Sequence, residues 1–160
     1  MSELVLISGS GRGLGASIAK SFINSGYMVA INYSKSKEKA EKLVQELGEN
    51  AHAFCADVSD MEQVKKMIKE IETKFDQSPS ILVNNAMTEY VFNGDERKFA
   101  DEISWDEISQ HLDVTLKGSL NLIQSLIPSM KHHSHGRIIN IGTNLVQNPV
   151  VPYHDYTIAK

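Results

Sequence analysis

Short apolar runs alternate with amphipathic stretches along the chain. The runs are apolar at consecutive positions, as expected for strands that are buried on both faces of a parallel sheet. The stretches between these runs have the pattern of helices, at residues 14–25, 37–47, 59–75 and 104–130. Strands that alternate with helices form βαβ units, which predicts an α/β fold of the Rossmann type: a doubly wound parallel sheet with helices on both faces. The predicted strands span residues 4–7, 28–31, 51–56, 81–83 and 138–141.

Several local signals predict where helices begin and end. Capping boxes mark two helix starts, at Ser59-x-x-Glu62 and at Ser104-x-x-Glu107. Pro128 is expected to bend or finish the last helix, because proline lacks a backbone donor. The polar segment from Thr88 to Ser104 has no clear period. A loop of that length in a compact domain is often functional, so it is interpreted either as a substrate lid or as a plain surface loop.

The composition is that of one ordinary globular domain, with 160 residues, 41% hydrophobic and 22% charged. A net charge of −4 gives no reason to expect nucleic acid or an anionic membrane as a partner. No stretch resembles a signal peptide or a transmembrane span. The single cysteine, Cys55, lies in an apolar run and is predicted to be a buried thiol. One cysteine forms no internal disulfide, which fits a reducing compartment and a cytoplasmic location.

A glycine cluster follows the first predicted strand and opens the first predicted helix. The spacing G-x-G-x-x-G is not met, because Leu14 stands at its third glycine position. The spacing G-x-x-x-G-x-G is met by Gly9, Gly13 and Gly15. Glycine allows a tight turn and a close approach of backbone to a diphosphate, which then faces the N–H groups of the helix. The sequence therefore predicts a dinucleotide site that includes Ser10, Gly11, Arg12 and Leu14 as well.

The end of the second predicted strand indicates which dinucleotide is bound. An NAD site usually carries Asp or Glu there, on the ribose hydroxyl. This chain has Asn32-Tyr33-Ser34, without a carboxylate, and offers the cations of Arg12, Lys35 and Lys37 nearby. A 2′-phosphate favours such groups, so NADP(H) is predicted in preference to NAD(H). The two lysines also fit a second interpretation, as part of the solvated face of the next helix.

The motifs together resemble the short-chain dehydrogenase/reductase family, in the same order along the whole chain. The glycine loop is similar to the family's T-G-x-x-x-G-x-G, and Tyr156-x-x-x-Lys160 to its Y-x-x-x-K. Among subfamilies the chain is most similar to 3-oxoacyl-[acyl-carrier-protein] reductases. The remaining resemblances are Asp57-Val58 after the third strand, Asn84-Asn85-Ala86 after the fourth, and Gly136-Arg137-Ile138-Ile139-Asn140-Ile141 before the catalytic serine position.

This resemblance implies a carbonyl reductase with defined residue roles. Tyr156 is the implied acid, and the ammonium of Lys160, one helical turn on, stabilises its phenolate and holds the nicotinamide ribose. Thr143 stands at the serine position, and Thr115 at the position of the proton-relay asparagine. The cofactor would contact Asp57 and Val58 at the adenine, and Asn85, Ala86 and Met87 near the nicotinamide ribose. The substrate would be a 3-oxoacyl thioester or a similar ketone.

Three positions depart from the family pattern: Thr143, Thr115 and Met87, the last at a family glycine. They leave a second hypothesis open, a catalytically weak NADP(H)-binding scaffold or sensor. A third keeps the enzyme with a small alcohol, sugar or steroid as substrate. The family usually continues for about a hundred further residues, so residues 1–160 are expected to be a domain incomplete at the C-terminus. The resemblance also implies a homo-oligomer, a dimer or tetramer.

No metal site is predicted. Three histidines lie between the last predicted helix and strand, where a solvated loop is the preferred interpretation: His132, His133 and His135. The spacing of four acidic residues matches no calcium loop: Asp95, Glu96, Asp101 and Glu102.

Overall fold

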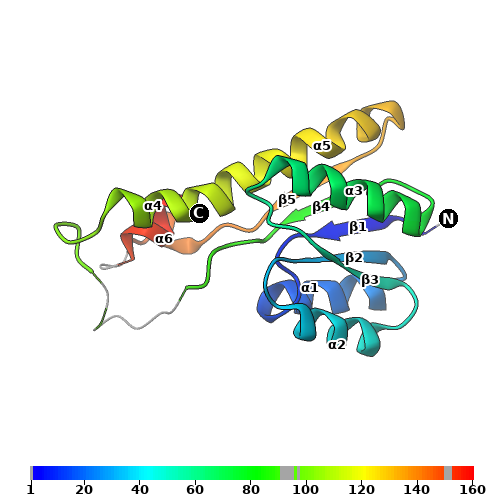
Figure 1. The fold of residues 1–160 in the computed structure, drawn as a ribbon, viewed down its shortest axis with the longest axis horizontal. Helices are drawn as coiled ribbons and strands as arrows, with labels where there is room; N and C mark the ends of the chain where they lie inside the picture. The colour runs from blue at the N-terminus through cyan, green and yellow to red at the C-terminus, as the bar shows by residue number, and fades with distance from the viewer. Residues whose placement is uncertain (1, 91–95, 97, 150–152) are drawn as a thin grey trace.

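The computed structural model describes residues 2–90, 96, 98–149 and 153–160. Its centre is a parallel sheet with the strand order β3-β2-β1-β4-β5 (Figure 1). Every neighbouring pair of strands is parallel, as the alternation of strands and helices predicted. The strands are β1 (Leu4–Ile7), β2 (Met28–Tyr33), β3 (Ala51–Cys55), β4 (Ile81–Asn84) and β5 (Arg137–Asn140).

Helices cover both faces of the sheet. Alternate residues of β1 point to opposite faces, so Leu4 and Leu6 join one buried cluster, and Val5 and Ile7 join the other. The first cluster packs against α3 (Met61–Phe75) and α5 (Gly118–His132), and the second against α1 (Gly13–Asn24) and α2 (Lys37–Leu47). Figure 1 shows these two helix layers on either side of the strands. The predicted doubly wound architecture is confirmed.

The predicted helix over 104–130 is a continuous rod with an irregular centre. It consists of α4 (Trp105–Leu112), the π-helix η2 (Asp113–Lys117) and α5, with right-handed helical backbone at both junctions. Pro128 lies inside α5, which continues to His132, so it does not finish the helix, and the alternative of a bend stays a prediction. Figure 1 shows the rod extending beyond the sheet, where α4 lies beside α6 (His154–Ala159).

One of the two predicted capping boxes is present. Ser104 Oγ accepts from the N–H of Glu107, and the Glu107 carboxylate accepts from the N–H of Ser104. The box at Ser59 is wrong: Asp60 is the N-cap of α3, and its carboxylate accepts from the N–H groups of Glu62 and Gln63. Ser59 instead donates its hydroxyl to Asp57. Neighbouring residues with equal capping capacity competed for that position.

The edge strand β3 is more exposed than the apolar pattern predicted. Cys55 ends the edge strand β3 and is exposed, so the prediction of a buried thiol is wrong. Its neighbour Phe54 takes the inward position, because successive strand residues face opposite sides. On the other edge, Ile138 and Ile139 of β5 are 39% and 42% exposed. Among the described residues no helix is long and apolar enough to cross a bilayer; the cytoplasmic location stays a prediction.

Candidate active site

The carboxyl ends of β1 and β4 form the switch point of the sheet. From β1 the chain continues to β2 and β3 on one side, whereas β4 and β5 lie on the other. Ligand crevices of open α/β sheets form where the crossover direction reverses. The glycine loop follows β1, and Asn85-Ala86-Met87 follows β4. The topology therefore places two of the predicted cofactor segments side by side.

Hydrogen bonds hold these two segments together. Ser8 Oγ accepts from the N–H of Asn85 and of Ala86, each at 3.0 Å. In return Asn85 Nδ2 donates to the carbonyls of Ser8 and Gly9, at 3.0 and 3.1 Å. Each segment thereby satisfies buried polar groups of the other, which fixes the glycine loop in one conformation. The Asn85 side chain is used in this contact, and its role toward a cofactor stays a prediction.

Two glycines are required by the close contacts of the loop. Gly9 has φ 61°, and a Cβ there would lie 2.8 Å from Ala86 Cα. A Cβ on Gly15 would lie 2.7 Å from Ser10 Cα. Gly13 also has a positive φ, 58°, although a Cβ would meet no described atom within 4 Å. Of the three glycines in the predicted spacing, Gly9 has both a left-handed backbone and close packing. Gly13 has the left-handed backbone alone, and Gly15 the close packing alone.

The first turn of α1 fits a diphosphate. Arg12 is the N-cap residue, with extended backbone and no side-chain hydrogen bond to the first turn. The leading N–H groups of a helix have no partner within it and carry partial positive charge. Leu14 beside them keeps 59% of its surface exposed. A dinucleotide held here would receive N–H donors from residues 13–15, with the Gly9 turn bringing the backbone close.

At the end of β2, Asn32 supports the glycine loop, whereas the residues after it are partly or fully exposed. Asn32 is buried; its Oδ1 accepts from the N–H of Gly9 at 3.1 Å, and its Nδ2 donates to the Ala56 carbonyl at 3.0 Å. Asn32 therefore braces the glycine loop against β3. Tyr33 is half-buried, and burial raises the pKa of its phenol. Ser34 is exposed, as are the nearby cations Arg12 and Lys35.

Asp57 and Val58 follow β3. Val58 is buried beneath Gly118, where a Cβ would lie 2.6 Å from Val58 Cγ2. The Val58 carbonyl accepts from Asn121 Nδ2 at 2.8 Å, which joins this turn to α5. Asp57 Oδ1 accepts from the Ser59 N–H and hydroxyl. The predicted adenine contact thus lies in a turn that α5 supports.

Three predicted catalytic residues lie on the segment that follows β5. Tyr156 lies on α6, and Lys160 is the C-cap of that helix. Lys160 Nζ donates at 3.2 Å to the carbonyl of Ile141, two residues before Thr143. Thr143 caps the short 3-10 helix η3 (Asn144–Val146), which packs against α6. Burial lowers the pKa of the Lys160 ammonium.

Thr115 and Met87 lie on two other segments, η2 and the segment after β4. Thr115 is the middle residue of η2, half-buried, and its carbonyl accepts from Ser119 Oγ at 2.6 Å. Met87 is half-buried after the Ala86 contact. Their roles toward substrate and cofactor stay predictions. The π-helix at Thr115 was not foreseen; such turns occur frequently at functional sites.

The comparison with known proteins decides the family. Residues 3–160 match the family model described as short chain dehydrogenase. The chain belongs to this family. It is 39% identical over 154 residues to the 3-oxoacyl-[acyl-carrier-protein] reductase FabG of Staphylococcus aureus, covering 93% of this chain and 60% of the relative. The predicted resemblance to reductases of this type is confirmed.

Solved short-chain dehydrogenases share the fold. A 3-ketoacyl-(acyl-carrier-protein) reductase from Brucella melitensis, complexed with NADH, has a TM-score of 0.87 and 26% identity, covering 98% of this chain and 64% of that one. A gluconate 5-dehydrogenase from Burkholderia cenocepacia, in complex with NADP and tartrate, has a TM-score of 0.82 and 30% identity, covering 100% and 61%. The chain spans 55–62% of the length of the curated relatives reported for it.

A buried acid–base pair beside Tyr156 was missed by sequence reasoning. Asp155 is only 5% exposed, and its Oδ2 lies 3.3 Å from His111 Nε2 on α4. Tyr90 donates its hydroxyl to Asp155 Oδ1 at 2.8 Å. The available signal was the charged Asp155 directly before Tyr156, but its partners are distant in the sequence.

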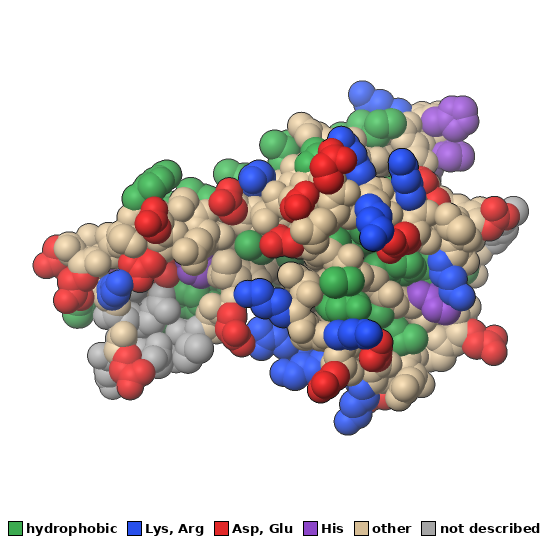
Figure 2. Space-filling model, viewed as in Figure 1, with side chains coloured by type: hydrophobic (Ala, Val, Ile, Leu, Met, Phe, Trp, Pro, Cys, Tyr) green, Lys and Arg blue, Asp and Glu red, His purple; other side chains and the backbone are tan. Residues whose placement is uncertain are grey.

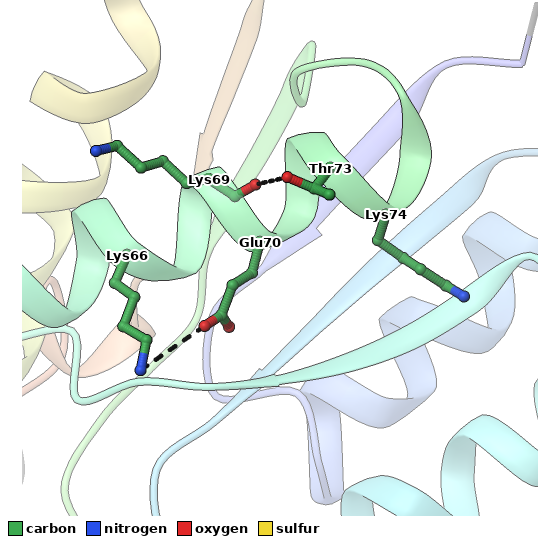
Figure 3. A pocket seen from close by; sticks show the side chains of 5 residues that line it. All are labelled: Lys66, Lys69, Glu70, Thr73 and Lys74. Atoms are coloured by element: carbon green, nitrogen blue, oxygen red, sulfur yellow. Dashed lines mark hydrogen bonds and ion pairs between the residues drawn. The ribbon is translucent and has the colours of Figure 1, made fainter.

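The surface of α3 in this short-chain dehydrogenase carries none of the predicted catalytic or cofactor residues. A shallow hollow on α3 is lined by lysines and their neighbours (Figure 3): Lys66, Lys69, Glu70, Thr73 and Lys74. Its contacts are local, an ion pair between Lys66 and Glu70 and a bond from Thr73 to the Lys69 carbonyl. Figure 2 shows positive and negative side chains mixed over this face. Within the described part of the chain, no cluster of three or more His, Cys, Asp or Glu is suited to a metal ion.

Proposed function

We propose that the protein is an NADP(H)-dependent oxidoreductase that reduces a carbonyl, a 3-oxoacyl thioester or a similar ketone, to an alcohol. The observation that carries this proposal is the juxtaposition at the sheet's carboxyl edge. A glycine loop clamped by Asn85 leads into the first turn of α1. The helix bearing Tyr156 and Lys160 packs on α4, and Lys160 Nζ donates to the Ile141 carbonyl just after β5. The similarity to 3-oxoacyl reductases supports the substrate class.

In the proposed reaction, the protein's residues bind and position the cofactor and the carbonyl substrate, and they supply a proton. The dinucleotide supplies a hydride for the carbonyl carbon when bound. Tyr156 donates the proton to the carbonyl oxygen, and the Thr143 hydroxyl donates a hydrogen bond to that oxygen. Lys160, half-buried one turn from Tyr156, stabilises the phenolate that remains and holds the ribose.

The cofactor preference rests on charge at the ribose end. No carboxylate occupies residues 32–34, and Arg12 is exposed at the N-cap of α1. Arg12 pairs with Glu89 at 3.4 Å, but both side chains are more than half exposed, so a phosphate would displace this weak pair. Replacing Arg12→Ala should raise the KM for NADPH about tenfold and leave that for NADH within twofold. Lys69→Ala, at an exposed cation on α3, is the matched control.

The proposal is tested by following NADPH oxidation with acetoacetyl-CoA, with NADH in parallel. Turnover that favours NADPH supports the proposal and shows that threonine serves at position 143. Tight NADPH binding without turnover, with this thioester and with a panel of small ketones, would instead favour an NADP(H)-binding scaffold or sensor. Turnover of a small alcohol, sugar or steroid alone would keep the enzyme and change its substrate.

The same proposal includes a homo-oligomer. Leu116 and Leu120 are 65% and 50% exposed and four residues apart, so they share one side of the rod. Ile158 on α6 is 57% exposed. Apolar side chains exposed on these two helices support their use as an interface between copies of the chain.

A further inference from the structure

We propose that His111 and Asp155 form a positioning pair for Tyr156, linked through Tyr90 to the segment that follows β4. This inference rests on the proposed function, since it gives these residues a role in the same reaction. The pair lies outside the set of residues that the motifs identified, and it joins the segment after β4, α4 and α6.

The pair is the centre of a chain of polar contacts. His111 Nδ1 faces Thr88 Oγ1 in a short hydrogen bond, and His111 Nε2 lies 3.3 Å from Asp155 Oδ2. The other carboxylate oxygen, Oδ1, accepts from the Tyr90 hydroxyl at 2.8 Å and from the N–H of Tyr156 at 2.8 Å. Both oxygens of Asp155 are therefore engaged: Oδ2 by α4, and Oδ1 by the segment after β4 and by the backbone of α6 itself.

Burial makes this arrangement specific. The side chains of His111 and Asp155 are 12% and 7% exposed, so water screens them little. A buried carboxylate is tolerated only when its oxygens are paired, which restricts the positions of all its partners. The exposed pair of His135 and Glu3, at 47% and 40%, lies at the opposite end of the sheet and lacks this restriction.

Two contacts transmit this restriction to Tyr156. Asp155 Oδ1 accepts from the N–H of Tyr156 at 2.8 Å in the first turn of α6. The Tyr90 ring packs on the Tyr156 ring with centroids 4.9 Å apart, and its own hydroxyl is fixed by Asp155. The pair thus fixes both the backbone and the ring of Tyr156. A displacement of about 1 Å at a reacting group lowers rates about a hundredfold, so loss of the pair should lower kcat.

The experiment compares kcat and KM for NADPH and acetoacetyl-CoA in matched variants. Asp155→Asn keeps the shape of the carboxylate and removes its charge, and Tyr90→Phe removes only the hydroxyl. His111→Gln keeps a donor, whereas His111→Leu does not. The controls are His135→Gln and Glu3→Gln, at the exposed pair. We expect kcat to fall at least tenfold in Asp155→Asn and His111→Leu, with the KM for NADPH within twofold. We also expect His111→Gln to recover part of the loss and both controls to match the wild type.

The outcomes separate this inference from the proposed function. A wild-type protein without turnover contradicts the proposed function and with it the inference. Wild-type turnover together with unchanged kcat in folded Asp155→Asn and His111→Leu overturns the inference alone. Equal loss in His111→Gln and His111→Leu would also contradict a positioning role through hydrogen bonds. If the buried variants do not fold, Tyr90→Phe decides: a fall in kcat of threefold or more supports the pair, and wild-type kcat overturns it.

Discussion

At the scale of single residues, the site depends on side chains that hold loops rather than on side chains that reach outward. Ser8, Asn32 and Asn85 all direct their polar atoms into the backbone of the glycine loop or its neighbours. Their hydrogen bonds satisfy groups that would otherwise be buried without partners. The proposed cradle for a diphosphate is consequently held by the protein's own hydrogen bonds, which reduces the ordering that binding requires.

Gly9 gives the sharpest residue-scale prediction. Gly9→Ala combines a left-handed φ, a penalty of about 1–2 kcal/mol, with a contact of 2.8 Å to Ala86 Cα, a penalty of about 1–3 kcal/mol. Gly26→Ala is the control, because Gly26 has φ 85° but no described atom within 4 Å of a Cβ. Urea unfolding should show Gly9→Ala less stable than Gly26→Ala by about 1 kcal/mol or more. Equal stability would contradict the close packing of the loop.

At the scale of elements, the rod from α4 to α5 is irregular at its centre, where it contains the π-helix η2. Its π-helix contains Thr115, while α4 presents His111 to α6 and α5 presents Asn121 to the turn after β3. One helix therefore contacts both the predicted catalytic end and the predicted adenine end of the site. Its start is fixed by the capping box at Ser104, where Lys98 also pairs with Glu107 at 2.7 Å.

The capping box makes a pH prediction. Hydrogen bonds from Lys98, and then from Ser104, lower the pKa of Glu107 from 4.5 to about 2. A carboxyl whose folded pKa is lowered stabilises the fold above its unfolded pKa, and this contribution is lost as pH falls towards the folded value. The thermal midpoint of the wild type should exceed that of Glu107→Gln at pH 6, and the difference should shrink by pH 3. A difference that stays constant over this range would contradict the account.

The elements also show what sequence reasoning could and could not reach. Apolar runs predicted all the strands, because a sheet covered on both faces needs them. Edge exposure at Cys55 was missed, since strand order is not visible in the local pattern. Asp60 displaced Ser59 as the cap because adjacent residues had equal capacity. The π-helix around Thr115 and the contact between His111 and Asp155 depend on tertiary packing, for which the sequence offered no periodic signal.

At the scale of the whole molecule, large apolar side chains are exposed on the rod, on α6 and at the β5 edge, and also at Leu14, Phe99 and Val146. The chain spans 60% of the length of its Staphylococcus aureus relative. Figure 2 shows hydrophobic side chains along the rod. Leu116 and Leu120, on one side of the rod, are the pair proposed to contact a second copy.

Leu120→Lys tests this surface. A charge placed in an apolar interface loses its hydration without a partner, so association should weaken. Light scattering coupled to size exclusion should show a smaller mass for Leu120→Lys than for the wild type. Thr73→Lys, which adds the same charge on the exposed face of α3, should leave the mass unchanged. Identical masses for Leu120→Lys and an oligomeric wild type would exclude this helix as the interface.

The most direct test of the whole account is the initial rate of NADPH oxidation with acetoacetyl-CoA in the wild type and in Tyr156→Phe. The variant keeps the ring that packs on Tyr90 and loses only the hydroxyl that would donate the proton. Loss of a general acid lowers rates about 10²–10⁴-fold, so the account predicts a fall of that size with NADPH binding unchanged. A Tyr156→Phe protein that turns over at the wild-type rate would contradict it.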